Sequence, residues 1–213
     1  MDVDVCPPIK EIRIVDGGLI APSAPPSEIG YAAKLATTRF GYPTLNHWCI
    51  WVEPDSTSPN LQARWLQRWS ESINAAIGTW SKVIPLTRVK EKDRAQIYVW
   101  RRRPPLRHLE SGWRASNGRS TLKLLDVKGQ GSWSLQPRVE VMVSPELRKP
   151  VIEATALHEL GHAFGLWGHS DDPGDAMAVS QRQTPVKALS RRDLTTIEWV
   201  RNQSGRFGFP LQN

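Results

Sequence analysis

The chain is poor in cysteine and contains no long apolar run. Cys6 and Cys49 are the only thiols in 213 residues. Two distant cysteines do not make the disulfide framework of a small secreted scaffold, although they would pair in an oxidising compartment. No run approaches the roughly 20 apolar residues that a membrane-spanning helix needs. The first residues lack the basic start and apolar core of a secretory signal. An ordinary globular protein is expected, with an intracellular location as the default.

Acidic residues are outnumbered by basic ones. The chain has 28 Lys and Arg against 21 Asp and Glu, which gives a formal net charge of +7. Such a surplus attracts anionic partners in general. No nucleic-acid-binding motif accompanies it, so a solvated basic surface is the favoured interpretation and nucleic acid is not an expected partner. The ten tryptophans fall mostly at periodic positions, which indicates packing in a core or cleft.

Proline and glycine are concentrated at the start of the chain. Residues 1–45 contain six prolines and the pair Gly17-Gly18, which interrupt any long periodic element. One short extended piece is expected between Ile9 and Ile14. This region is predicted to be an N-terminal arm packed on the following domain, a linker, or a pro-segment.

Residues 46–213 combine strand and helix patterns, so an α+β domain is predicted. The first helix is expected to begin after an N-cap at Ser58-Pro59. The last helix is expected to follow a capping box at Ser190–Asp193. A basic surface loop is expected at 101–118, and another loop at 128–136. Strands are predicted at 47–53, 84–89, 96–100, 121–127 and 138–143, and helices at 61–80, at 151–165 and after Ser190.

The clearest chemical signal is a cluster of histidines after Val151. His158 and His162 lie four residues apart, so on a helix both imidazoles project from one face and can bind one cation. Glu159 lies one step round the same turn, close enough to accept a proton from a metal-bound water without being a ligand. Gly165 lets the helix end and the chain turn back, which brings His169 within reach as a third ligand. Three protein ligands with one open position are typical of a catalytic zinc.

The same segment resembles the zinc motif of the metzincin endopeptidases, in particular the matrixin-like ones of the small bacterial kind. Their motif is HExxHxxGxxH followed by a methionine turn. His158, Glu159, His162 and Gly165 match it in register, and Met177 stands where the methionine turn belongs. Weaker similarity extends over about residues 46–203.

The chain departs from the matrixin pattern after the glycine. Trp167 looks inserted, so the third histidine falls one residue late, at His169. The loop must therefore bulge, and Gly168 would permit this. Asp171 or Asp172 are alternative third ligands, less favoured because the spacing to the methionine fits His169.

Two further family features are not matched. Ala178-Val179-Ser180 replaces the proline and tyrosine that help wall the primed-side pocket of matrixins. No segment matches the family's loop for a structural zinc and calcium; His108 and Glu110 are the only obvious ligands in the basic loop.

The resemblance implies a twisted mixed sheet of about five strands with three helices, one of them the active-site helix. It implies a catalytic domain over 46–213 and a zinc-dependent endopeptidase acting on a protein or peptide substrate. His158, His162 and His169 would bind Zn²⁺, Glu159 would be the general base, and Met177 would form an apolar floor.

The resemblance also raises a role for Cys6. A pro-segment cysteine blocks the zinc of matrixins, so Cys6 is a candidate latency ligand, with an incidental thiol as the favoured alternative. The rival interpretation of the whole chain is a zinc-binding module associated with DNA or protein that has little or no peptidase activity.

Overall fold

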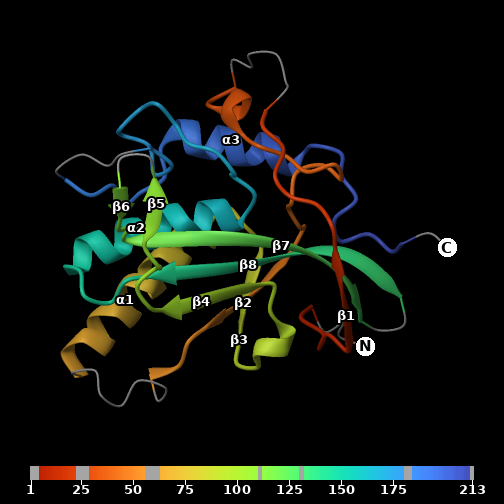
Figure 1. The fold of residues 1–213 in the computed structure, drawn as a ribbon, viewed down its shortest axis with the longest axis horizontal. Coiled ribbons are helices and arrows are strands. Elements are labelled where there is room, and N and C mark those ends of the chain that lie inside the picture. The colour runs from red at the N-terminus through yellow and green to blue at the C-terminus, as the bar shows by residue number, and fades with distance from the viewer. Residues whose placement is uncertain are drawn as a thin grey trace.

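The computed structural model describes residues 5–22, 29–55, 63–109, 112–129, 132–179 and 184–211. Within these residues one mixed six-stranded sheet is accompanied by three α-helices (Figure 1). The helices are α1 (Ala63–Trp80), α2 (Lys149–Ala163) and α3 (Arg191–Arg201), and a 3-10 turn η1 (Ala32–Lys34) contacts α3. The sheet strands are β1 (Glu11–Val15), β2 (Trp48–Val52), β3 (Leu86–Val89), β4 (Ile97–Arg101), β7 (Gly118–Lys128) and β8 (Trp133–Val143).

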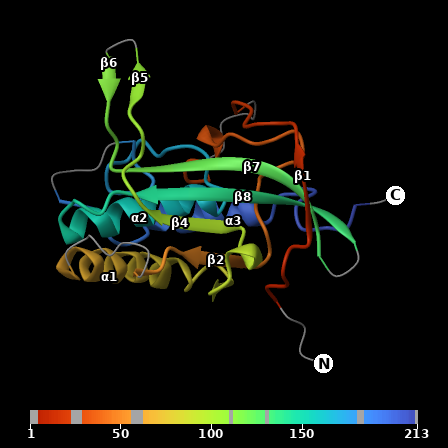
Figure 2. The ribbon, with the colours of Figure 1, turned by 60° about the horizontal axis from the view of Figure 1, so that its bottom comes forward.

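The strand order is β1-β7-β8-β4-β2-β3. β1, β7 and β8 pair antiparallel, whereas β8, β4, β2 and β3 pair parallel. The helix α2 packs against β7, β8 and α1, and all three helices lie on one side of the sheet (Figure 2). The α+β class, the three helices and the mixed sheet were expected from the sequence. The sheet has six strands instead of about five because the N-terminal arm contributes β1.

In α1 and α3 the buried residues fall on one face, whereas α2 is buried on nearly all sides. On α1 the buried side chains include Trp69, Ile73 and Ile77, which are spaced four residues apart. The capping box of α3 is present, because the Ser190 hydroxyl accepts from the Asp193 amide at 3.0 Å and the Asp193 carboxylate accepts from the Ser190 amide at 2.9 Å. The predicted N-cap of α1 at Ser58-Pro59 lies outside the described residues.

The described part of the N-terminal arm belongs to the same sheet and core. β1 pairs with the second half of β7, from Glu11 opposite Lys128 to Val15 opposite Leu124. Further along, Tyr31 is buried, and its hydroxyl donates to the Asp193 carboxylate on α3 at 2.8 Å. The described residues before position 45 therefore pack as part of the same domain.

The expectation of a surface loop over 101–118 was wrong at both ends. Arg101 is the buried last residue of β4, and β7 already begins at Gly118. Arg101 tolerates burial because its guanidinium pairs with Asp55 and lies 4.6 Å from the centre of the Trp69 ring. Between them, β5 (Arg107–Leu109) and β6 (Gly112–Arg114) form a separate antiparallel hairpin. The loop expected at 128–136 is shorter than predicted, because β8 starts at Trp133.

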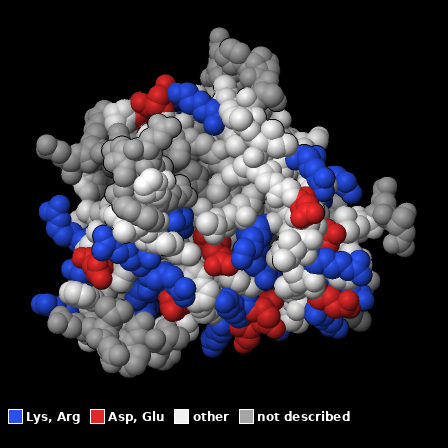
Figure 3. Space-filling view, viewed as in Figure 1, with Lys and Arg blue, Asp and Glu red and all other residues white. Residues whose placement is uncertain are grey.

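The surface mixes both signs of charge. Lys and Arg side chains gather with Asp and Glu over the lower part of the face in Figure 3. In the described parts of the chain, no helix is long and apolar enough to cross a membrane.

Candidate metal centre

Three histidines converge at the end of α2. His158 and His162 project from the last two turns, with ring centres 4.8 Å apart. Gly165 then adopts a φ of +115°, a left-handed conformation that favours glycine, and the chain turns back. The His169 ring lies 5.2 Å from that of His158 and 4.9 Å from that of His162. One ring nitrogen from each histidine lies within 4.8 Å of the others. The third residue of the group is thus His169.

Two of the imidazoles are oriented by backbone carbonyls. His158 Nδ1 lies 2.9 Å from the Ala176 oxygen, and His162 Nδ1 lies 2.6 Å from the Leu166 oxygen. A carbonyl can only accept, so each Nδ1 carries the proton and each Nε2 keeps a lone pair. A hydrogen-bond partner on the ring nitrogen that faces away from the metal is the usual arrangement around a histidine that binds a metal.

Burial keeps these imidazoles neutral. Desolvation lowers the pKa of His158 to about 4 and that of His162 to about 3. Burial also lowers the pKa of His169. At neutral pH all three rings are therefore in the unprotonated form that binds a metal. Three neutral imidazoles beside an open cleft fit the donor set of a catalytic zinc.

The alternative ligands Asp171 and Asp172 are engaged elsewhere. The Asp171 carboxylate pairs with Lys34 and with Arg192, both at 2.9 Å. Asp172 Oδ1 accepts from the Gly174 amide at 2.8 Å. Neither carboxylate belongs to the group that the three imidazoles form.

The extra residue before His169 is accommodated by packing. The Trp167 ring stacks on His162, with centres 5.5 Å apart and an interplanar angle of 19°. The Trp167 carbonyl accepts from the Ala36 amide at 2.8 Å. Gly168 was expected to allow a bulge through its backbone freedom, but it does not have a positive φ. A Cβ at Gly168 would lie 2.3 Å from the Lys34 carbonyl oxygen, so the glycine is required for close approach to η1.

Met177 is fully buried and packs against α2 at Gly161. A Cβ on Gly161, between the two helical histidines, would lie 2.2 Å from the Met177 sulfur. The turn around Met177 is held by the Ser170 amide, which donates to the Met177 carbonyl at 2.8 Å. The predicted methionine turn therefore packs directly against the histidine-bearing helix.

Asp193 links the methionine turn to the C-terminal helix. Besides capping α3, its Oδ2 accepts from the Ala176 amide at 2.8 Å, and the Ala176 carbonyl in turn holds His158. The sequence pattern of the capping box identified Asp193 as a helix cap. Its contact with Ala176 depends on how α3 packs, and no sequence pattern indicated it.

Glu159 is buried where α2 meets the start of β7. The Ser120 hydroxyl lies 2.8 Å from Glu159 Oε2 and 2.9 Å from the Glu159 carbonyl oxygen. A Cβ at Gly118 would lie 2.7 Å from Glu159 Cγ, so only glycine fits at this strand position. Sequence reasoning missed both Gly118 and Ser120, because nothing in the sequence indicates which strand lies against the motif.

Two cavities flank Glu159 and meet at Gly118. One has a volume of about 390 Å³, the other about 460 Å³, and both are lined by Ser116, Gly118 and Glu159. The first also contacts His158 and Val179, and the second also contacts His169. Together they form a cleft that crosses the three histidines.

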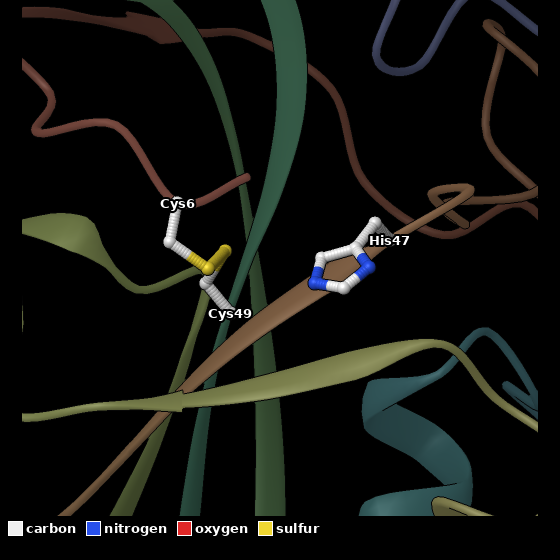
Figure 4. A group of neighbouring side chains, drawn as sticks. All are labelled: Cys6, His47 and Cys49. Carbon is white, nitrogen blue, oxygen red and sulfur yellow. A yellow bond between two sulfur atoms is a disulfide. The ribbon is translucent and has the colours of Figure 1, made fainter. Parts of the chain in front are cut away.

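The remaining predicted residues lie elsewhere. Cys6, the candidate latency ligand, forms a disulfide with Cys49, and the His47 ring lies beside the two sulfurs (Figure 4). His47 Nε2 is 3.0 Å from the Thr87 hydroxyl. Bonded to each other, the sulfurs are not thiolates, and they do not join the three imidazoles. In the basic loop His108 is exposed, while Glu110 is outside the described residues.

The chain was compared with protein-family models and with curated proteins, and nothing in either set matches it. A proposal about function therefore rests on the geometry of the centre and on the residues of its motif.

Proposed function

We propose that this protein is a zinc-dependent endopeptidase of matrixin-like type, which hydrolyses peptide bonds in the cleft beside β7. The observation that carries the proposal is the grouping of three neutral imidazoles, two of them oriented through Nδ1, next to the carboxylate of Glu159. Met177 adds support, because it is buried against α2 at Gly161 and the resemblance implies a methionine that forms an apolar floor there.

His158, His162 and His169 would hold the metal through ring nitrogens. Bound there, a zinc ion would polarise a substrate carbonyl and lower the pKa of a coordinated water towards ~7. Glu159 would accept the proton at its carboxylate and deliver it to the leaving amine. Ser120 keeps Oε2 of that carboxylate fixed, while Oε1 lies beside Gly118, which lines both halves of the cleft.

The cleft suits an extended peptide. Near Glu159 the outer side of β7 is paired with no other strand in the described part of the chain, and an extended peptide can add to such a side through main-chain hydrogen bonds. The cavities on either side of Glu159 would then take side chains from both sides of the cleaved bond. The rival interpretation is a zinc-binding module with little or no peptidase activity. It does not account for the carboxylate of Glu159 in this cleft.

The test combines metal analysis with peptide cleavage. The purified protein should bind about one zinc per chain and cleave members of a diverse peptide library, and a chelator should abolish cleavage. Glu159→Ala should retain the metal but lose at least ~100-fold in kcat, because a positioned base contributes about 10²–10⁴. Glu153→Ala, on the same helix but away from the cleft, is the control and should match the parent. Parent-like cleavage by Glu159→Ala would remove this residue as the base, and a metal-loaded parent that cleaves nothing would favour the rival.

A further inference from the structure

The N-terminal arm and the candidate centre share one edge of the sheet. β1 is hydrogen-bonded along the outer side of β7 from Lys128 to Leu124. At the other end of β7, Gly118 and Ser120 contact Glu159. Between these two ends, Ser120–Lys123 pair with β8 on one side, and no strand within the described residues pairs with them on the other.

The arm leaves this edge before it reaches the centre. After Val15 the chain passes through Gly17, whose φ is +147°. Ile20 then pairs with Thr37 through two main-chain hydrogen bonds of 2.7 and 3.1 Å. Figure 2 shows the segment after β1 turning away from β7. The arm is thus anchored on both sides of the turn, by β7 before it and by Thr37 after it.

Leu19, at the apex of this turn, lines the larger cavity together with His169 and Trp167. Its side chain is 41% exposed, so it faces the open space of the cleft instead of the core. The smaller cavity, on the other side of Glu159, is lined by no residue of the arm among those that the structure describes. The described part of the arm therefore bounds one end of the cleft.

β1 also indicates the direction in which this edge accepts a chain. It pairs antiparallel with β7, and its C-terminal end points towards Glu159. A peptide that adds in the same direction would be collinear with β1, and its N-terminus would meet Val15 and Asp16. An extended chain advances ~3.4 Å per residue, so the stretch Ser120–Lys123 faces at most ~4 peptide residues.

On this basis we infer that the N-terminal arm closes the cleft on the side of the substrate's N-terminus. The inference rests on the proposed peptidase function and names its substrate class: peptides cut at a bond preceded by no more than ~4 residues. The chain following the cut bond leaves through the smaller cavity, which no described residue of the arm lines, so its length is not restricted. Leu19 determines how much room remains at the closed end.

The experiment uses the zinc-loaded full-length protein and two ladders of synthetic peptides. Both ladders contain one cleavable core, found in the library screen. One ladder extends it at the N-terminus to two, four, six and eight residues before the cut bond, and the other extends it equally after that bond. We expect kcat/KM to fall about tenfold or more between four and six N-terminal residues, since the longer tail must displace packed chain. The C-terminal ladder should show no such step.

A pair of variants tests whether the arm causes this fall in kcat/KM along the N-terminal ladder. Leu19→Ala should raise kcat/KM for the six-residue peptide several-fold relative to the four-residue peptide. Leu194→Ala removes a leucine of similar exposure, 37%, on α3, and should leave that ratio unchanged. Equal rates along the N-terminal ladder, or a step on the C-terminal ladder instead, would overturn the inference and leave the peptidase proposal intact. Absence of cleavage for every peptide by the metal-loaded protein would overturn both.

Discussion

The Ser120 hydroxyl lies 2.8 Å from Oε2 of Glu159 and 2.9 Å from the carbonyl oxygen of the same residue. One hydroxyl on β7 therefore contacts both the side chain and the backbone of the proposed base. The contact is close because Gly118, two residues earlier on the same face of β7, leaves room for the Glu159 side chain. Strand and helix thus position the carboxylate jointly.

Replacement of Ser120 should impair catalysis without removing the metal. Ser120→Ala leaves Glu159 without its hydroxyl partner. We expect kcat to fall about 10–100-fold with little change in KM, the range seen when a hydrogen bond that orients an active-site residue is lost. Ser120→Thr keeps the hydroxyl and should restore part of the rate. Thr121→Ala, whose side chain points to the opposite face, is the control. An unchanged kcat in Ser120→Ala would show that the contact does not position the base.

Two glycines in helices should respond to alanine in opposite ways. A Cβ at Gly161 would lie 2.2 Å from the Met177 sulfur, so Gly161→Ala should destabilise the fold by about 1–3 kcal/mol through overpacking. Gly78 on α1 has nothing within 4 Å of an added Cβ, and Gly78→Ala should stabilise by about 0.5–1 kcal/mol. Urea unfolding followed by tryptophan fluorescence measures both. Equal effects of the two substitutions would contradict the packing of Met177 against α2.

The metal-free protein should lose stability on mild acidification. Burial lowers the pKa of His158 to about 4 and that of His162 to about 3, so the unfolded chain, with pKa values near 6.5, binds protons first. The stabilisation is complete above pH ~6.5 and is lost as pH falls towards these lowered values. Between pH 7 and pH 5 each histidine should contribute a loss of up to about 2 kcal/mol. Thermal unfolding of the protein, freed of metal by a chelator, across this pH range measures the loss of stability. His162→Asn should have a shallower pH dependence, and a flat profile in the parent would argue against burial of neutral imidazoles.

The disulfide should stabilise the fold and have no part in latency. Cys6 and Cys49 are separated by 43 positions, and loss of a bond closing such a loop costs about 2–4 kcal/mol. Cys6→Ser should lower the Tm without raising zinc-dependent activity. Cys49→Ser should have the same effect, and the double variant should add nothing further because one bond is lost in each case. A rise in activity specific to Cys6→Ser would revive the latency hypothesis.

The sequence predicted local features well where one residue pattern determined one structure. The helix bearing His158 and His162, the capping box at Ser190 and the buried stripe of α1 follow from periodicity and side-chain chemistry alone. Arg101 shows the opposite case, because its burial depends on Asp55 and Trp69, which are distant in sequence. Charge and local pattern placed it in a surface loop.

By itself the sequence determined the candidate base and two candidate ligands, since spacing along one helix places His158 and His162 on the same face. It left the third ligand open between His169 and the carboxylates of Asp171 and Asp172. Only the tertiary structure decided what surrounds the candidate ligands and base. Ser120, Gly118 and Leu19 come to the cleft because β7 and the N-terminal arm pack beside α2, and no local pattern encodes a contact between segments so far apart in the chain. Long-range packing of this kind depends on how whole elements bury their apolar faces together, and that is a property of the folded chain.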